Sequence, residues 1–116
     1  GVGENGHIAF NDPWTADFND PAVIKAVDLD ERCRMQQVHD GCFDRIEDVP
    51  RQALTVTIPA LCRARFMFCS VPGSTKADAV ARMLQGDVTV DCPATILRRH
   101  AHAALYIDRD AAAGIL

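Results

Sequence analysis

Residues 65–86 constrain the fold more than any other part of the chain. Residues 65–71, RFMFCSV, form a nearly continuous apolar run, which is typical of a strand covered on both faces. Residues 72–86, PGSTKADAVARMLQG, follow at once; they place Val80, Met83 and Leu84 on one helical face and end at Gly86. A buried strand that leads directly into an amphipathic helix predicts part of a strand–helix–strand unit.

The rest of the chain also alternates between strand and helix patterns. Asp30 is the expected N-cap of one helix and Gly41 its end. The predicted elements are a strand at 22–29, a helix at 30–41, a strand at 52–58, a helical turn at 59–64, a helix at 93–100, a strand at 103–110 and a frayed helix at 111–116. This order predicts an α/β fold with a Rossmann-like three-layer parallel sheet and helices on both faces. In such sheets ligands bind at the carboxyl ends of the strands.

Composition excludes several classes of protein. The net charge is −4, basic residues form no stripe, and aromatic residues make up 6%, so we expect no nucleic-acid partner. No apolar run is long enough to span a membrane. The 5 cysteines form no C-x-x-C pair, which argues against a zinc ribbon or a disulfide framework and favours a cytoplasmic setting. His100 and His102 lack further ligands at metal-site spacing, so we expect no metal.

The chemistry of the chain is concentrated in its first thirteen residues, GVGENGHIAFNDP. Glycines let the backbone approach a ligand closely, and Asn5-Gly6 is a strong turn signal directly before His7. Imidazole titrates near neutral pH, so a histidine beside short polar groups such as Asp12 suits general acid–base catalysis. A surface turn with an incidental histidine is the alternative.

This string resembles the signature of the glucosamine-6-phosphate deaminase (isomerase) family, which shares its fold with the 6-phosphogluconolactonases. The family stretch reads approximately G-x-G-x-D-G-H-I-A-F-N-E-P. The matching residues are Gly1, Gly3, Gly6, His7, Ile8, Ala9, Phe10, Asn11 and Pro13. Segments 49–56 and 71–86 also look like family motifs, and 92–108 matches more loosely. The resemblance implies that residues 1–116 are the C-terminal part of a single domain, truncated at its N-terminus.

The resemblance implies conversion of glucosamine 6-phosphate and water to fructose 6-phosphate and ammonia. His7 would open the sugar ring with support from Asn5 and Asp12, while Gly3 and Gly6 form the substrate loop. The aspartate base would lie outside this chain, so we expect these residues alone to be inactive. The reaction needs no cofactor because acid–base groups can move the proton between two carbons. Family members occur as monomers or hexamers, which allows a homo-oligomer.

Two cations are the candidates for binding the phosphate of a phosphosugar. Lys76 lies in the first turn of its predicted helix, where a cation opposes the helix dipole, and a bound phosphate would explain it. Arg34 looks like the family's second phosphate-binding residue, with Arg32 as its alternative. An exposed lysine and a solvated helix face are the simpler interpretations.

Two positions depart from the family pattern. Asn5 stands where the family has aspartate, and Asp12 stands where it has glutamate. The first change removes a negative charge near the histidine, and the second shortens the reach of the carboxylate. The alternatives are therefore a related sugar-phosphate isomerase or lactonase, or a non-catalytic sugar-phosphate-binding regulatory homologue. The IAFN string after His7 argues against the lactonase.

Overall fold

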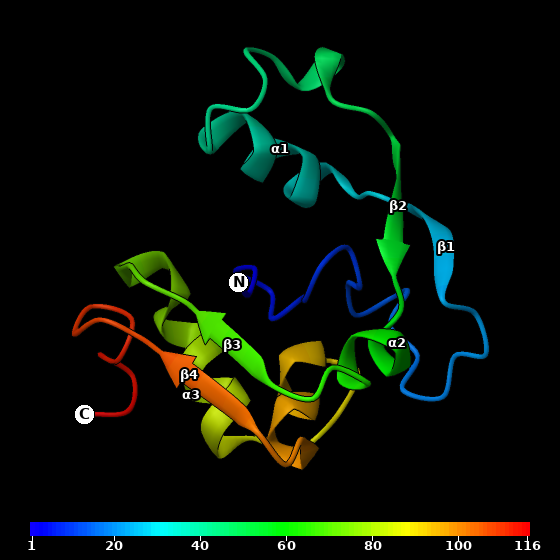
Figure 1. Cartoon of the computed structure of the whole chain (residues 1–116). Coiled ribbons are helices and arrows are strands. Elements are labelled where there is room, and N and C mark those ends of the chain that lie inside the picture. The colour runs from blue at the N-terminus through cyan, green and yellow to red at the C-terminus, as the bar shows by residue number, and fades with distance from the viewer.

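The strands form two separate two-stranded sheets in the computed structural model, which describes residues 1–116 (Figure 1). β1 (Ile24–Asp28) pairs antiparallel with β2 (Gln52–Val56), and β3 (Met67–Ser70) pairs parallel with β4 (Ala103–Tyr106). The prediction of an α/β chain is confirmed. The prediction of a single parallel sheet is wrong for β1 and β2, because these two strands are antiparallel. Helix α1 (Glu31–His39) lies beyond the ends of these strands instead of crossing their faces, so the chain returns antiparallel.

Most of the helical segments lie at predicted positions, although several are short; the segment at 46–48 was not predicted. They are α1, η1 (Ile46–Asp48), α2 (Ile58–Cys62), η2 (Ser74–Lys76), α3 (Ala77–Gln85) and η3 (Pro93–Arg99), where η denotes a 3-10 helix. The side chain of Asp30 caps α1 by accepting a hydrogen bond from the Cys33 N–H at 2.7 Å, as expected. Gly41 follows with a φ of 78°, which a residue with a side chain rarely adopts. No helix has both the length and the apolar character that a membrane crossing requires.

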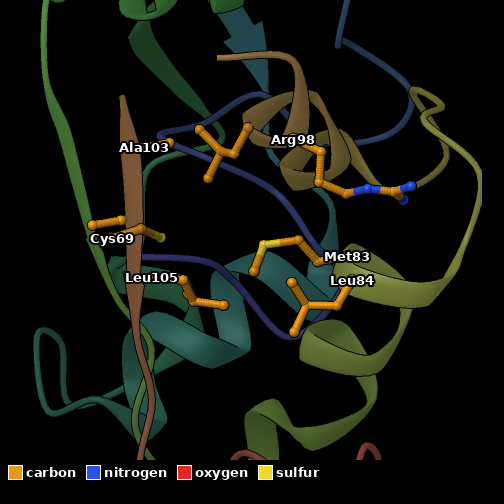
Figure 2. Close-up of a pocket in the computed structure, with 8 residues that line it drawn as sticks. Cys69, Met83, Leu84, Arg98, Ala103 and Leu105 are labelled. Atoms are coloured by element: carbon orange, nitrogen blue, oxygen red, sulfur yellow. The ribbon is translucent and has the colours of Figure 1, made fainter. Parts of the chain in front are cut away.

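The strand–helix–strand unit predicted from residues 65–86 is present. Between β3 and β4 the chain passes through α3, which buries Ala79, Val80 and Met83. The predicted helix face is therefore confirmed, although Leu84 remains 38% exposed at its edge. Figure 2 shows Met83 and Leu84 of α3 beside Leu105 of β4, where they line an apolar pocket against the strands.

The expectation that β3 is covered on both faces is wrong for these residues. Successive side chains of a strand point to opposite faces. Cys69 is buried against α3, whereas Phe68 is 74% exposed and its neighbour Tyr106 on β4 is 57% exposed. The aromatic side chains of this second face therefore meet solvent.

The C-terminal residues 111–116 form consecutive turns, not the frayed helix that was predicted. Six residues provide too few hydrogen bonds to offset the cost of nucleating a helix. Ala111 and Ala112 are nevertheless buried, so this end of the chain packs onto the protein.

One hydrophobic core joins the N-terminal loop to the β3–β4 unit. The loop contributes Val2 and Ile8, and β3 contributes Cys69. The full set of core residues is Val2, Ile8, Ile58, Cys69, Val71, Ala79, Val80, Met83, Ala94, Ile96 and Ala111. This packing fixes the glycine-rich loop against the carboxyl end of β3.

Candidate functional site

The glycine-rich loop folds into a tight turn that presents His7. The Gly3 N–H donates to the His7 carbonyl at 2.9 Å, and the Gly6 N–H donates to the Gly3 carbonyl at 2.9 Å. Gly6 has a φ of 86°. A Cβ on Gly3 would lie 2.0 Å from Cε1 of the His7 ring, and a Cβ on Gly6 would lie 2.5 Å from Sγ of Cys92. Both positions therefore require glycine.

The structure brings together the three residues proposed as catalytic. Nδ1 of His7 lies 2.8 Å from Oδ1 of Asn5 and 3.2 Å from Oδ1 of Asp12. Nδ2 of Asn5 donates to the same Asp12 oxygen at 2.9 Å. The Asp12 side chain is fully buried, and 14% of the His7 side chain is exposed. Asn5 thus bridges the histidine and the carboxylate.

These contacts determine which ring nitrogen of His7 carries the proton. Oδ1 of Asn5 already accepts the backbone N–H of His7 at 3.0 Å, so this atom is the amide oxygen. A ring nitrogen that faces an amide oxygen and a carboxylate must donate a hydrogen bond. Neutral His7 therefore carries its proton on Nδ1, which leaves Nε2 able to accept a proton from a ligand and to return it.

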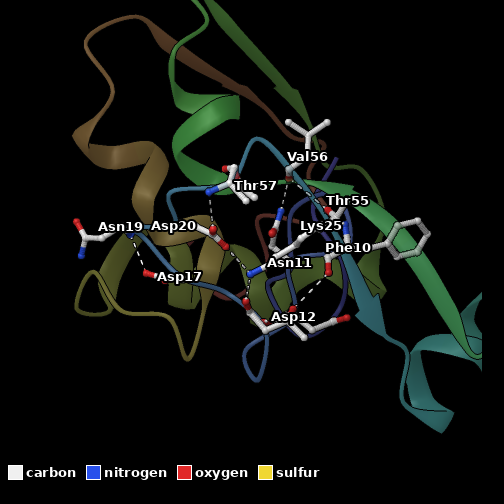
Figure 3. Close-up of polar contacts among 12 residues, drawn as sticks. Phe10, Asn11, Asp12, Asp17, Asn19, Asp20, Lys25, Thr55, Val56 and Thr57 are labelled. Carbon is white, nitrogen blue, oxygen red and sulfur yellow. Dashed lines mark hydrogen bonds and ion pairs between the residues drawn. The ribbon is translucent and has the colours of Figure 1, made fainter.

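Asn11 anchors the loop to β2, a role that its match to the family motif did not reveal. Its Nδ2 donates to the carbonyls of Ile8 and Val56, both at 2.9 Å, and the Phe10 N–H donates to Oγ1 of Thr55 at 3.0 Å. Figure 3 shows Asn11 between the loop and β2. Because Asn11 precedes Asp12, these bonds fix the backbone that carries the buried carboxylate.

Lys76 lies beside the same loop, although 74 residues separate it from its partner. Its Nζ donates to the Val2 carbonyl at 2.9 Å. An ammonium group has three N–H donors, so two remain for an anion. Lys76 is half-buried at the end of η2, where it is the residue before α3; the sequence placed it slightly further along, in the first turn of the helix. Lys76 and the loop that carries His7 therefore lie together at the carboxyl end of the β3–β4 pair.

Asp108 supports the segment that carries Lys76, and the sequence analysis missed it. Gly73 has a φ of 99°, and its N–H donates to both carboxylate oxygens of Asp108 at 3.0 and 3.1 Å. The Ala111 N–H donates to Oδ1 at 2.8 Å. Asp108 follows β4 at the carboxyl end of a parallel strand, which is the only sequence signal that could have indicated it.

Stability at acidic pH is expected to depend on Asp108. Its hydrogen bonds from Ala111 and Gly73 hold the pKa of this carboxyl below its usual value of 3.8. A lowered folded-state pKa stabilises the fold above the unfolded-state pKa, and this contribution is lost as pH falls through the folded-state value. We expect Asp108→Asn to lower Tm at pH 7 and to weaken the fall in Tm below about pH 4. Thermal melts against pH test this, with exposed Asp110→Asn as the control; equal acid sensitivity of both variants would contradict it.

Arg34, the second residue proposed to bind phosphate, makes hydrogen bonds to backbone carbonyls. Its Nη2 donates to the carbonyls of Ile46 at 2.8 Å and Val49 at 3.1 Å, so the guanidinium ties α1 to the loop before β2. Arg32, the alternative, is exposed two residues nearer the start of α1. Since Arg34 already has backbone partners, Arg32 is the more available cation.

His7, Asp12 and Cys33 offer three potential metal ligands whose atoms lie within 4.8 Å of one another. A thiol binds a metal as thiolate. Burial, followed by the negative charges of Asp12 and Asp30, raises the pKa of Cys33 to about 12. The Nδ1 atom of His7 is also engaged by Asn5 and Asp12. This cluster is therefore set up for hydrogen bonding, with its thiol protonated at neutral pH.

His100 and His102 contact protein groups at the start of β4. Nε2 of His100 lies 2.7 Å from the Ala64 carbonyl, and its Nδ1 accepts the His102 N–H at 3.0 Å. The ring of His102 packs against Phe66, with centroids 5.3 Å apart. These contacts give both histidines a structural role next to β4.

Comparisons with known proteins place this geometry in a family context. No family model matches the chain. It is 42% identical over 111 residues to "Glucosamine-6-phosphate deaminase" of Bacillus cereus strain B4264, covering 96% of this chain and 40% of that protein. It is 42% identical over 112 residues to the protein of the same name from Exiguobacterium sibiricum, covering 97% of this chain and 42% of the relative. The chain thus spans well under half the length of these curated relatives.

A solved structure shows the same arrangement of elements. It is described as a monomeric glucosamine-6-phosphate deaminase and "missing link of the NagB superfamily". It matches with a TM-score of 0.89 and 34% sequence identity, over 97% of this chain and 45% of that chain.

The chain is an α/β chain whose fold matches that of a solved structure described with the NagB superfamily. In sequence, it is a homologue of the glucosamine-6-phosphate deaminases over nearly its whole length. The resemblance carried by GVGENGHIAFNDP is therefore confirmed.

Proposed function

We propose that the protein containing these residues is an amino-sugar phosphate deaminase that converts glucosamine 6-phosphate and water to fructose 6-phosphate and ammonia. The observation that carries the proposal is the His7 ring, oriented by Asn5 and Asp12 with Nε2 left for a ligand. The homologues named above support the choice of substrate. The chain covers well under half their length, so the activity belongs to the longer protein.

In this mechanism His7 transfers a proton to and from the sugar ring oxygen at Nε2. When the imidazole gains a proton there, the Asp12 carboxylate 3.2 Å from Nδ1 stabilises the resulting positive charge. Asn5 keeps the ring plane fixed through its contact with Nδ1. A base outside these residues moves the proton between C2 and C1. Water then hydrolyses the imine, which gives the ketose and releases ammonia.

Asn5 and Asp12 preserve the contacts that the relay needs, despite their departure from the family pattern. The shorter Asp12 still reaches Nδ1, and the neutral Asn5 still accepts from His7 while it donates to Asp12. The retained contacts of Asn5 and Asp12 with His7 favour an enzyme over a non-catalytic sugar-phosphate-binding homologue. The IAFN continuation still argues against a lactonase.

The phosphate of the substrate is proposed to bind at Lys76 and the start of α3. The two free donors of Lys76 and the N–H groups at the helix start suit a phosphate. An arginine of α1 completes the site: Arg34 by its resemblance to the family, or Arg32 by its exposure. Gly3 and Gly6 keep the substrate loop close to the sugar.

The larger protein is proposed to complete the sheet. The parallel β3–β4 pair would then be part of a three-layer sheet with helices on both faces, and residues 1–116 would be part of a single domain. The exposed Phe68 and Tyr106 fit this proposal because a second layer would cover them. All 5 cysteines are free, which suits a cytoplasmic enzyme.

The function is tested with the full-length gene product and glucosamine 6-phosphate. We expect equal amounts of ammonia and fructose 6-phosphate, each measured by a coupled enzymatic assay. Saturable phosphosugar binding without either product would favour the regulatory homologue. Turnover of a different phosphosugar only would change the substrate but keep the reaction class.

Replacing Lys76 with methionine is expected to raise KM about ten- to hundredfold while kcat changes less, because a hydrogen bond to a charged group contributes roughly 1.5–3 kcal/mol. Lys25→Met is the matched control, since Lys25 is the only other lysine and its Nζ pairs with Asp20 at 2.7 Å. Steady-state kinetics and inhibition by inorganic phosphate measure the effect. An unchanged KM in Lys76→Met would remove this residue from the phosphate site.

A further inference from the structure

The buried thiol of Cys33 faces the His7–Asp12 pair, although neither the mechanism nor the sequence analysis uses it. Cys33 lies in the first turn of α1, where its backbone N–H is held by the Asp30 cap. Its side chain is only 5% exposed. Sγ of Cys33, a carboxylate oxygen of Asp12 and a ring nitrogen of His7 lie within 4.8 Å of one another. Helix α1 therefore delivers a thiol to the proposed catalytic pair.

The carboxylate of Asp12 lacks a partner on one side. Oδ1 accepts one hydrogen bond from Asn5 and faces His7, whereas Oδ2 is buried without a hydrogen-bond partner. A buried carboxylate oxygen left without a donor is costly. The charge of Asp12 thus depends on few donors, and any additional donor near Oδ2 favours the ionised form.

Cys33 has the protonation state that a donor needs. Burial and the nearby carboxylates of Asp12 and Asp30 raise the pKa of this thiol to about 12, so it carries its proton at neutral pH. An S–H group is a weak hydrogen-bond donor. The groups that titrate in this cluster are His7 and Asp12 from the loop, with Asp30 and Cys33 from α1.

We propose that Cys33 is a positioning residue whose thiol, within 4.8 Å of the Asp12 carboxylate, turns to donate to the unpartnered Oδ2 and keeps Oδ1 turned toward His7. The thiol acts through Asp12 and does not contact the substrate. It favours the ionised carboxylate, which the imidazolium form of His7 requires as a partner. Its effect on turnover rests on the proposed deaminase function, whereas its effect on the protonation of Asp12 does not.

The test compares Cys33→Val, Cys33→Ser and Cys62→Val in the full-length gene product. Valine removes the donor, and serine keeps one. Cys62 is a half-buried cysteine that packs against the core, so it serves as the matched control. Two measurements are made on each protein: the pH profile of kcat/KM, and the titration of the Asp12 side-chain carbon by NMR. The Asp12 signal is assigned by its absence in Asp12→Asn.

We expect Cys33→Val to move the acid limb of the rate profile and the Asp12 titration upward together by less than about one pH unit, because an S–H donor is weaker than the donor of a typical net hydrogen bond. Cys33→Ser should stay near the parent protein, and Cys62→Val should not shift either curve. Cys33→Ala replaces the valine variant if thermal melts show that valine disrupts the fold.

A loss of kcat/KM that is the same at every pH, with an unchanged Asp12 titration, would show that Cys33 only fills space and would overturn the proposal. The proposal would also be overturned if Cys33→Ser shifted the rate profile and the Asp12 titration as much as Cys33→Val does, because serine keeps a donor. If the parent protein does not deaminate glucosamine 6-phosphate, the proposed function fails, but the NMR titration still decides the role of Cys33.

Discussion

Replacing His7 with glutamine is expected to lower kcat/KM for glucosamine 6-phosphate by about 10²–10⁴-fold, the usual contribution of a positioned general acid–base group. Glutamine can fill much of the space and can hydrogen-bond to Asn5, but it cannot exchange a proton near neutral pH. The structure predicts that kcat falls most, because the ring oxygen must be protonated after the sugar has bound. KM should change little, since the proposed phosphate site at Lys76 on η2 is unaltered.

The control for this variant is His39→Gln, which changes an exposed histidine at the end of α1. It should leave both kinetic constants near those of the parent protein. Steady-state kinetics across pH 5–9 and a thermal melt of each protein provide the comparison. Full turnover by His7→Gln in a folded protein would exclude His7 as the proton carrier, and ring opening would then need another residue.

The second large effect is expected from Gly3→Ala. A Cβ at Gly3 would lie 2.0–2.4 Å from three atoms of the His7 ring, far inside van der Waals contact. The imidazole must therefore leave its position between Asn5 and Asp12, or the loop must move. We expect kcat/KM to fall to the level of His7→Gln, and we expect the free energy of unfolding to fall by about 1–3 kcal/mol through overpacking.

Two comparisons separate displacement of the ring from general damage to the loop. Gly1→Ala is the matched control, because a Cβ there would meet only the Ser70 carbonyl at an ordinary 3.6 Å. The double variant Gly3→Ala/His7→Gln should be no less active than either single variant, since both remove the same function. A multiplicative loss in the double variant would show that Gly3 acts independently of His7, contrary to the structure.

Much of the local structure was predictable because it depends on neighbouring residues. The capping carboxylate of Asp30, the apolar face of α3 and the turn before His7 are all set by short-range patterns. The orientation of β2 relative to β1 was not predictable in this way. A strand–helix–strand pattern is the same whether the helix crosses the sheet or lies beyond its end, as α1 does.

The candidate site shows the same division. His7, Asn5 and Asp12 are close in sequence, so their proximity could be anticipated from the loop alone. Asp108 and Cys33 were missed because their partners are distant in the chain: Asp108 holds Gly73, and Cys33 approaches Asp12. Arg34 was proposed for phosphate, but the fold engages it with two backbone carbonyls, which no local pattern reveals.

The sequence by itself therefore determined the residues of the loop, the helices that flank it and the resemblance to the deaminases, because turns, caps and amphipathic faces arise from neighbouring side chains. Only the tertiary structure decided which ring nitrogen of His7 is free, that Lys76 reaches the carbonyl of Val2, and that the Cys33 thiol lies within 4.8 Å of a carboxylate oxygen of Asp12. These features depend on how packing of the core brings distant segments together, and a linear pattern carries no distance between such segments.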